Sequence, residues 1–191
     1  MKKTKLSELF TYENTVCAMS KKAKVLVWNN RTMLIAEENS DLICGKSLNF
    51  DELIKGALEK DVDAVTVLLF AAITNGIDDF SADEFFKYFS ASDFEKYYFA
   101  VIDGLVNYLP EKEVQEQLKE MNEGEVDESL EGEEPDHWAF LFYFCKKYFS
   151  MTNEEFLNST WRSISILQRE FIKNSPQYKQ NRTVSAEFVD I

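Results

Sequence analysis

The sequence predicts a mainly helical protein: a small helical bundle with a short N-terminal β-hairpin, an acidic linker and a C-terminal pair of helices. Three observations predict this class. Glycine and proline, which interrupt helices, number only 6 and 3 among 191 residues. Hydrophobic residues make up 45% of the chain, enough to bury a core. From residue 49 onward, apolar residues recur at three- and four-residue spacing after capping signals, as in amphipathic helices.

The N-terminal segment, residues 1–48, has the least regular pattern. Apolar runs at 25–28 and 33–35 flank Asn29 and Asn30. Adjacent asparagines tolerate the left-handed backbone of a tight turn, so this pattern predicts a hairpin made of the two runs. A helix from about residue 32 to 38 fits the same residues and competes with the hairpin. We take the hairpin as the prediction.

Residues 49–110 are predicted to be the helical core of an N-terminal domain that spans residues 1–122. Four antiparallel helices joined by short loops account for the pattern most economically. The second of them, at 62–75, is apolar nearly all round, which predicts burial on most sides. Side chains that can accept hydrogen bonds from a first helical turn mark the helix starts. These capping signals are Asn49 with Glu52, Asp61, Ser81 with Glu84, and Ser92 with Glu95.

The negative charge of the chain is concentrated in one stretch. Residues 111–136 carry 12 acidic and 2 basic side chains, which is −10 of the total net charge of −13. Within that stretch, residues 123–136 contain two glycines, a proline and almost nothing apolar. Such a segment cannot bury itself, so we predict a flexible acidic linker at 123–136.

Residues 137–173 are predicted to form an aromatic C-terminal helical segment, with Thr152 and Glu155 as a capping box, followed by a loose tail at 174–191. Eight apolar residues follow one another from Trp138 to Cys145, too many for two helices to hide alone. These residues either pack against the N-terminal domain or form a partner site, and the flexible tether favours the partner site. The candidate partner-binding residues are Trp138, Phe142, Phe149, Phe156 and Trp161.

No motif in the sequence indicates catalysis or metal binding. The single histidine, His137, has no nucleophile motif beside it, as a general base would need. Cys17, Cys44 and Cys145 are far apart and lack the spacing of zinc ligands. We therefore expect no enzymatic activity, no cofactor and no metal site.

The charge and the apolar runs also bear on partners and location. A net charge of −13 repels phosphate backbones and anionic lipids, so we expect no binding to nucleic acid or membranes. The N-terminus lacks the apolar core of a signal peptide, and the apolar runs are too short to span a bilayer. These features predict a cytoplasmic protein that works by binding other proteins.

Parts of the chain resemble a known family. The helical core has a helix that ends in a charged turn, then a buried helix, then a capped helix after a short loop, at residues 50–65, 68–73 and 80–85. This pattern resembles the tail assembly chaperones of long-tailed bacteriophages. The C-terminal segment is similar to the aromatic extension of that family's longer form, through Trp138, Tyr143, residues 149–156 and residues 160–161.

The resemblance implies a non-virion assembly factor in the host cytoplasm, without catalytic residues. Such a factor binds the tape measure protein, keeps it soluble and recruits the tail tube (major tail) protein, which the C-terminal extension contacts. Self-association is a further partner prediction. The acidic linker lies where the frameshift junction between the family's short and long forms would fall.

An alternative function is an acidic DNA mimic that inhibits a host nucleic-acid-binding protein. This interpretation rests on the net charge of −13. Mimicry requires carboxylates held at phosphate-like spacing, whereas most of the charge here falls in the predicted flexible linker. The clustering therefore favours the chaperone.

Overall fold

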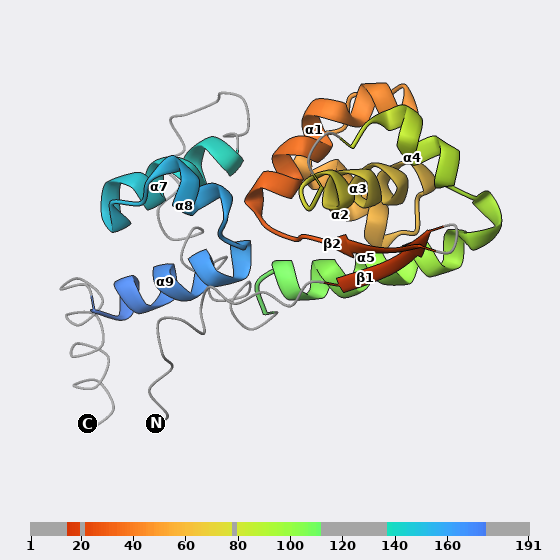
Figure 1. Ribbon diagram of the computed structural model, residues 1–191. Coiled ribbons are helices and arrows are strands. Elements are labelled where there is room, and N and C mark those ends of the chain that lie inside the picture. Colours follow the sequence, from red (N-terminus) through yellow and green to blue (C-terminus); the bar gives the residue numbers. More distant parts are fainter. Residues whose placement is uncertain (1–14, 20–21, 78–79, 112–136, 175–191) are drawn as a thin grey trace.

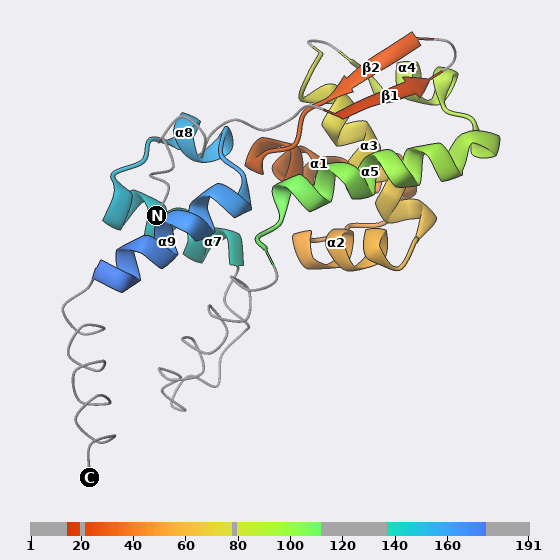
Figure 2. The ribbon, with the colours of Figure 1, turned by 90° about the horizontal axis from the view of Figure 1, so that it is seen from below.

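The computed structural model describes residues 15–19, 22–77, 80–111 and 137–174. The described residues are mainly helical, as predicted, and form two lobes that lie side by side (Figures 1 and 2). The larger lobe holds a hairpin and helices α1 to α5, and the smaller lobe holds α7 to α9. The predicted linker at 123–136 lies outside the described residues, as does the predicted tail except for Asn174, which ends α9.

A β-hairpin is present, but it lies earlier in the chain than predicted. Strand β1 (Thr15–Met19) pairs antiparallel with β2 (Lys22–Leu26). The run predicted as the second strand belongs instead to helix α1 (Asn30–Cys44), so the competing helix interpretation was correct there. The reason is local: Asn29 caps the helix, its side chain accepting a hydrogen bond from the Thr32 N–H at 3.1 Å, instead of forming a turn.

Helix α3 (Val62–Thr74) lies at the centre of the larger lobe (Figure 1). It contacts α1, α2 (Phe50–Leu58), α5 (Phe94–Tyr108) and β2. Every residue from 64 to 73 is buried, which confirms the prediction from its all-round apolar pattern. The predicted caps are also present: Asn49 and Glu52 form a reciprocal capping box on α2, and Asp61 caps α3.

Helices α4 (Ala82–Tyr88) and α5 (Phe94–Tyr108) complete the larger lobe. Ser81 caps α4 as predicted. The second predicted box, Ser92 with Glu95, is wrong: residues 91–93 form a 3-10 turn, and the Ser92 hydroxyl lies 2.8 Å from that of Ser90.

Helix α5 packs closely on the short connection between β2 and α1, which contains Trp28. A Cβ atom on Gly104 would lie 2.0 Å from Cε2 of Trp28, a distance that no real Cβ contact reaches. Only glycine therefore fits at this position without displacing the buried indole of Trp28.

The smaller lobe contains three helices where two were predicted: α7 (His137–Phe149), α8 (Asn153–Leu157) and α9 (Trp161–Asn174). The predicted capping box of Thr152 and Glu155 is present on α8. The expected second helix is divided because Thr160 and Ser163 start a new one. The Ser163 N–H donates to Thr160 Oγ1 at 3.1 Å, and the Thr160 N–H donates to Ser163 Oγ at 3.2 Å.

Each lobe has its own hydrophobic cluster. The cluster of the larger lobe surrounds α3, and that of the smaller lobe is built on the buried side chains of Leu141, Cys145, Phe156 and Ile164. Trp138 and Trp161 pack against both clusters. The two lobes are therefore joined by shared apolar contacts as well as by the polar contacts described next.

Candidate functional site

Asn30, the first residue of α1, is the central polar contact between the lobes. Its side chain is fully buried. Its Nδ2 donates to the carbonyl oxygen of Phe156 at 2.9 Å, and its backbone N–H donates to the carbonyl of Ser159 at 2.8 Å. The Tyr108 hydroxyl donates to Asn30 Oδ1 at 3.0 Å. One amide thus links α1, α5 and α8, and a buried amide that is hydrogen-bonded through both its nitrogen and its oxygen favours a single arrangement.

The Tyr108 hydroxyl remains a donor over the whole physiological pH range. Burial, and then the negative charge of Glu37, raise the pKa of Tyr108 well above its usual value. The protonated phenol therefore continues to hydrogen-bond to Asn30.

Two arginines add contacts between the lobes. Arg31 on α1 forms two 2.8 Å hydrogen bonds to the carboxylate of Glu154 on α8. Hydrogen bonds from Asn158 and Arg31 lower the pKa of Glu154. On the other side of the junction, Arg162 donates to the carbonyls at the end of α5, at 3.1 Å to residue 109 and 2.8 Å to residue 106. A cation at a helix C-terminus is favourable because those carbonyls lack helical partners.

Aromatic rings close the junction from the apolar side. Phe50, which begins α2, packs edge-to-face against Trp138 at 5.1 Å and against Trp161 at 5.5 Å between ring centroids. Phe50 itself is 4% exposed. The C-terminal aromatic segment therefore packs on the larger lobe in this structure and does not extend away from it.

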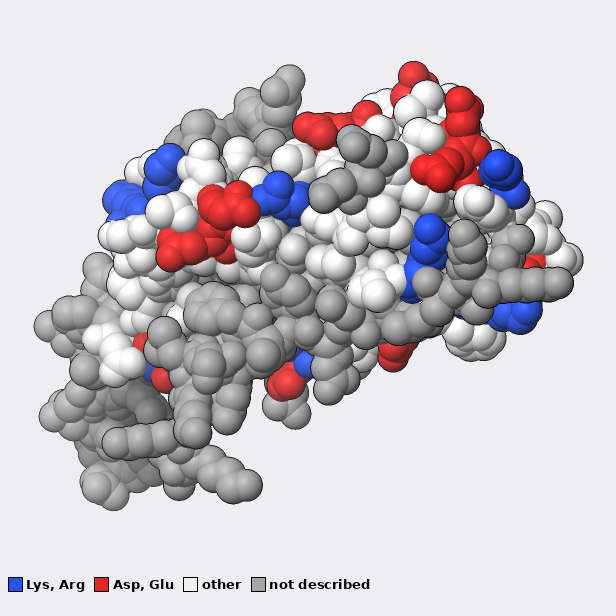
Figure 3. All heavy atoms as spheres, viewed as in Figure 1, with Lys and Arg blue, Asp and Glu red and all other residues white. Residues whose placement is uncertain are grey.

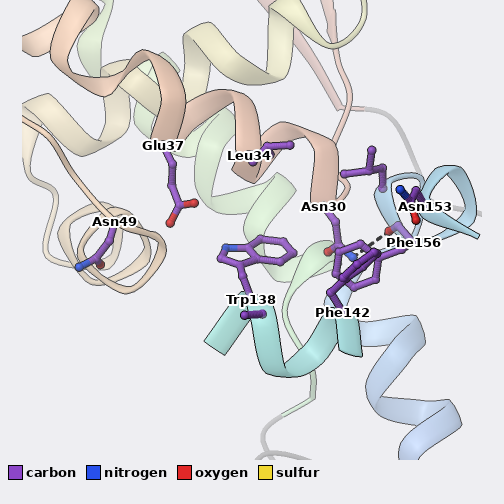
Figure 4. A pocket seen from close by; sticks show the side chains of 10 residues that line it. Asn30, Leu34, Glu37, Asn49, Trp138, Phe142, Asn153 and Phe156 are labelled. Carbon is purple, nitrogen blue, oxygen red and sulfur yellow. Dashed lines mark hydrogen bonds between the residues drawn. The ribbon is translucent and has the colours of Figure 1, made fainter. Parts of the chain in front are cut away.

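A groove remains open between α1 and the helices α7 and α8 (Figure 4). Its volume is about 540 Å³, within the range of pockets that hold ligands. Apolar side chains form its walls, and amides with one carboxylate add polar groups. The lining residues are Asn30, Leu34, Glu37, Asn49, Trp138, Ala139, Phe142, Asn153, Phe156 and Leu157.

In Figure 4 the Trp138 ring lies between Glu37 above it and Phe142 beside it. Glu37 accepts a hydrogen bond from the backbone N–H of Phe50. The groove therefore presents aromatic surface next to a fixed negative charge. This arrangement suits an apolar side chain with a donor or a cation beside it.

The structure brings together three of the five residues predicted to bind a partner. Trp138, Phe142 and Phe156 line the groove. Trp161 lies in the junction against Phe50, and Phe149 packs in the cluster of the smaller lobe. The role of these five residues in partner binding stays a prediction.

Sequence reasoning missed the wall of the groove that α1 contributes. Asn30, Leu34 and Glu37 are spaced four and three residues apart, so they share one face of a helix. The hairpin prediction concealed this face, because it placed Asn30 in the turn, Leu34 in a strand and Glu37 beyond that strand. The signal that could have revealed it was the competing helix interpretation.

Within the described residues, no helix is both long and apolar enough to cross a membrane, and no three acidic, cysteine or histidine side chains gather as a metal site would require. Burial raises the pKa of the Cys145 thiol to about 12, which disfavours the nucleophilic thiolate. No family model, curated protein or solved structure matches the chain. The functional proposal therefore rests on the residues and their geometry.

Proposed function

We propose that the protein is a tail assembly chaperone of a long-tailed bacteriophage, which binds the tape measure protein, keeps it soluble and recruits the tail tube protein in the host cytoplasm. The observation that carries the proposal is the groove between the lobes. It is lined by aromatic residues from the segment that resembles the family's extension, and by α1 of the larger lobe.

The groove suits an apolar helical client. Leu34 on α1 and Phe142 on α7 belong to opposite walls, so side chains from one face of an amphipathic helix can enter between them. Asn49 and Asn153 offer amide groups to polar residues of the client. Glu37 can accept from a lysine or arginine beside the apolar anchors.

The size of the groove is consistent with a reversible chaperone. A volume of about 540 Å³ accepts only a few side chains, so a single engagement buries little surface and releases readily. A long helical client offers many such sites along its length. Several chaperone molecules can then cover it and keep its apolar faces from associating, while their negative charge keeps the assembly soluble.

Co-expression with the tape measure protein of a long-tailed bacteriophage tests the proposal. The expected result is a soluble tape measure protein that co-purifies with the chain. Leu34→Glu should abolish this effect, because it places a charge on the groove wall at a side chain that is already 40% exposed and so tolerates a polar substitution. Leu42→Glu is the matched control, since Leu42 is on the same helix, is 65% exposed and does not line the groove.

An insoluble tape measure protein in the presence of the wild-type chain would overturn the chaperone proposal. If the tape measure protein is equally soluble with Leu34→Glu and Leu42→Glu, the groove is not the site of chaperone function. Capture of a host nuclease or polymerase as the main bound protein would favour the DNA-mimic alternative. Leu34 is a sharper probe than Trp138 or Trp161, whose replacement would also disturb packing against Phe50.

A further inference from the structure

A row of rings, exposed at its two ends and half-buried in the middle, runs along α7 on the side away from the groove. Phe140, Phe144 and Tyr148 follow one another at four-residue spacing, with neighbouring ring centroids 6.4 and 4.8 Å apart. Phe171 of α9 lies against this row, 5.1 Å from Tyr148 and 6.1 Å from Phe144. These rings, with Tyr143 and Lys147, are called the aromatic–lysine face.

The exposure of this face contrasts with the rest of α7. Phe140 is 53% exposed and Tyr143 is 58% exposed, whereas Leu141 and Cys145, which face the core of the smaller lobe, are almost fully buried. The core of the lobe is therefore complete without these outer rings. A contiguous patch of large exposed rings typically marks a site where another molecule binds.

Lys147 places a positive charge within the face. Its Nζ lies 5.4 Å from the ring centroid of Tyr143 and 5.2 Å from that of Tyr148. A hydrogen bond with Tyr143 raises the pKa of Lys147, so it is a cation at neutral pH. Among the described residues, no carboxylate forms an ion pair with Lys147, and its charge is free to attract an acidic group.

The local charge of α7 is opposite to that of the whole chain. The helix carries Lys146 and Lys147 in its last turn and no acidic residue, in a protein of net charge −13. Figure 3 shows basic atoms gathered over the left-hand end of α7. This face is complementary to a partner that presents carboxylates.

The size of the face selects a short partner segment over a second copy of the chain. Four rings of the face are about half exposed: Phe140, Tyr143, Tyr148 and Phe171. An aromatic side chain carries roughly 200 Å² of surface, so these four offer about 400 Å². A stable protein–protein contact buries about 800 Å² on each side. Two copies paired through α7 would also bring their Lys147 charges to the same interface, which disfavours self-association there.

We propose that the aromatic–lysine face binds a short amphipathic helix of another protein, with acidic side chains beside its apolar anchors. The anchors lie against the ring row of α7 and Phe171, and a carboxylate pairs with Lys147. This face is distinct from the groove, because Phe140, Phe144 and Tyr148 occupy the opposite side of α7 from Trp138 and Phe142. The inference therefore stands apart from the proposed chaperone function.

Two fluorescent peptides of about four helical turns test the inference. Both carry leucines on one face; glutamates flank the leucines in the first peptide and lysines in the second. Each peptide is titrated with the full chain carrying Leu34→Glu, which blocks the groove, and binding is followed by fluorescence anisotropy. The glutamate peptide should bind roughly tenfold more tightly or better, and salt should weaken its binding. Lys147→Glu should remove this preference, and Tyr148→Ser should weaken binding of the glutamate peptide severalfold.

Matched controls separate the face from general exposure. Lys55→Glu reverses the charge of an exposed side chain on α2, and Phe99→Ser removes a ring that is 65% exposed on α5. Neither substitution should change peptide binding. Equal affinity for the two peptides would overturn the inference, as would an effect of Phe99→Ser equal to that of Tyr148→Ser. A dimer that Tyr148→Ser dissociates would assign the face to a second copy instead. Binding of the glutamate peptide should be the same with and without Leu34→Glu, so failure here is distinguishable from failure of the chaperone proposal.

Discussion

Replacement of Asn30 by alanine should loosen the junction between the lobes. The substitution removes the hydrogen bonds to Tyr108 and Phe156 and leaves the fully buried Tyr108 hydroxyl without its acceptor. The carbonyl of Phe156 still accepts a hydrogen bond from the Ser159 N–H at 3.1 Å, so the free-energy cost at this carbonyl is smaller. A buried group left unpaired costs about 1–3 kcal/mol, and we expect a total of about 2–3 kcal/mol.

Urea unfolding followed by circular dichroism measures this loss in the free energy of unfolding. For a chain of this size, the same loss lowers the melting temperature by roughly 4 to 12 °C. Asn39→Ala is the control, because among the described residues the Asn39 amide donates to the carbonyl of Ile35 within its own helix and to no group of the other lobe. A loss for Asn30→Ala that does not exceed that of Asn39→Ala would refute the view that the Asn30 amide holds the lobes together.

Three further predictions concern single side chains. Gly104→Ala should destabilise the fold by about 2 kcal/mol or more, measured by thermal denaturation, because its Cβ would overlap Trp28. Gly45→Ala is the control, since an added Cβ there meets no atom within 4 Å and the only cost is the backbone φ of 72°. A smaller shift in melting temperature for Gly104→Ala than for Gly45→Ala would contradict the prediction. Arg162→Ala should cost about 1–2 kcal/mol in urea unfolding and speed amide exchange in α9, because the carbonyls ending α5 lose a charged donor. Burial raises the pKa of Cys145 from 9.0 to about 12, so the folded chain holds a proton that the unfolded chain releases. Stability should therefore fall as pH rises from 9 toward 12, less steeply in Cys145→Val, and an unchanged slope in that variant would contradict the assignment.

Local patterns predicted the helices of this protein well. The capping signals at Asn49, Asp61, Ser81 and Thr152 each mark a real helix start, because a side-chain acceptor for the first turn acts within three or four residues. The same logic placed α3 at the centre of the core, since an all-round apolar helix has no face suited to water.

Errors arose where one residue type serves two local structures. Asn29 could have formed a turn or a cap, and the cap prevailed because the apolar residues that follow share helical spacing. The break before α9 was missed for a different reason. It depends on Thr160 with Ser163, and on the Ser159 carbonyl, which accepts from Asn30 in the other lobe. A contact between residues so far apart in the chain leaves no periodic signal in the sequence.

The aromatic residues of the candidate site were identified from the sequence, but their surroundings were not. Trp138, Phe142 and Phe156 stand out as apolar residues in a segment too small to bury them all. Which residues face them depends on how the lobes meet, and Asn30 bonds to Phe156 across 126 positions of sequence. The groove is thus a tertiary feature, formed when α1 supplies its second wall.

Because the groove takes its walls from both lobes, its occupancy and the association of the lobes are thermodynamically linked. A client that touches α1 and α7 together stabilises the docked arrangement of the lobes. By linkage, it raises the free energy of lobe separation by the same amount that lobe separation reduces the binding free energy of the client. Arg162 lies outside the groove lining, yet it helps to set the fraction of molecules whose lobes are docked. The apparent affinity for a client scales with that fraction, so a residue that never touches the client can still tune its release.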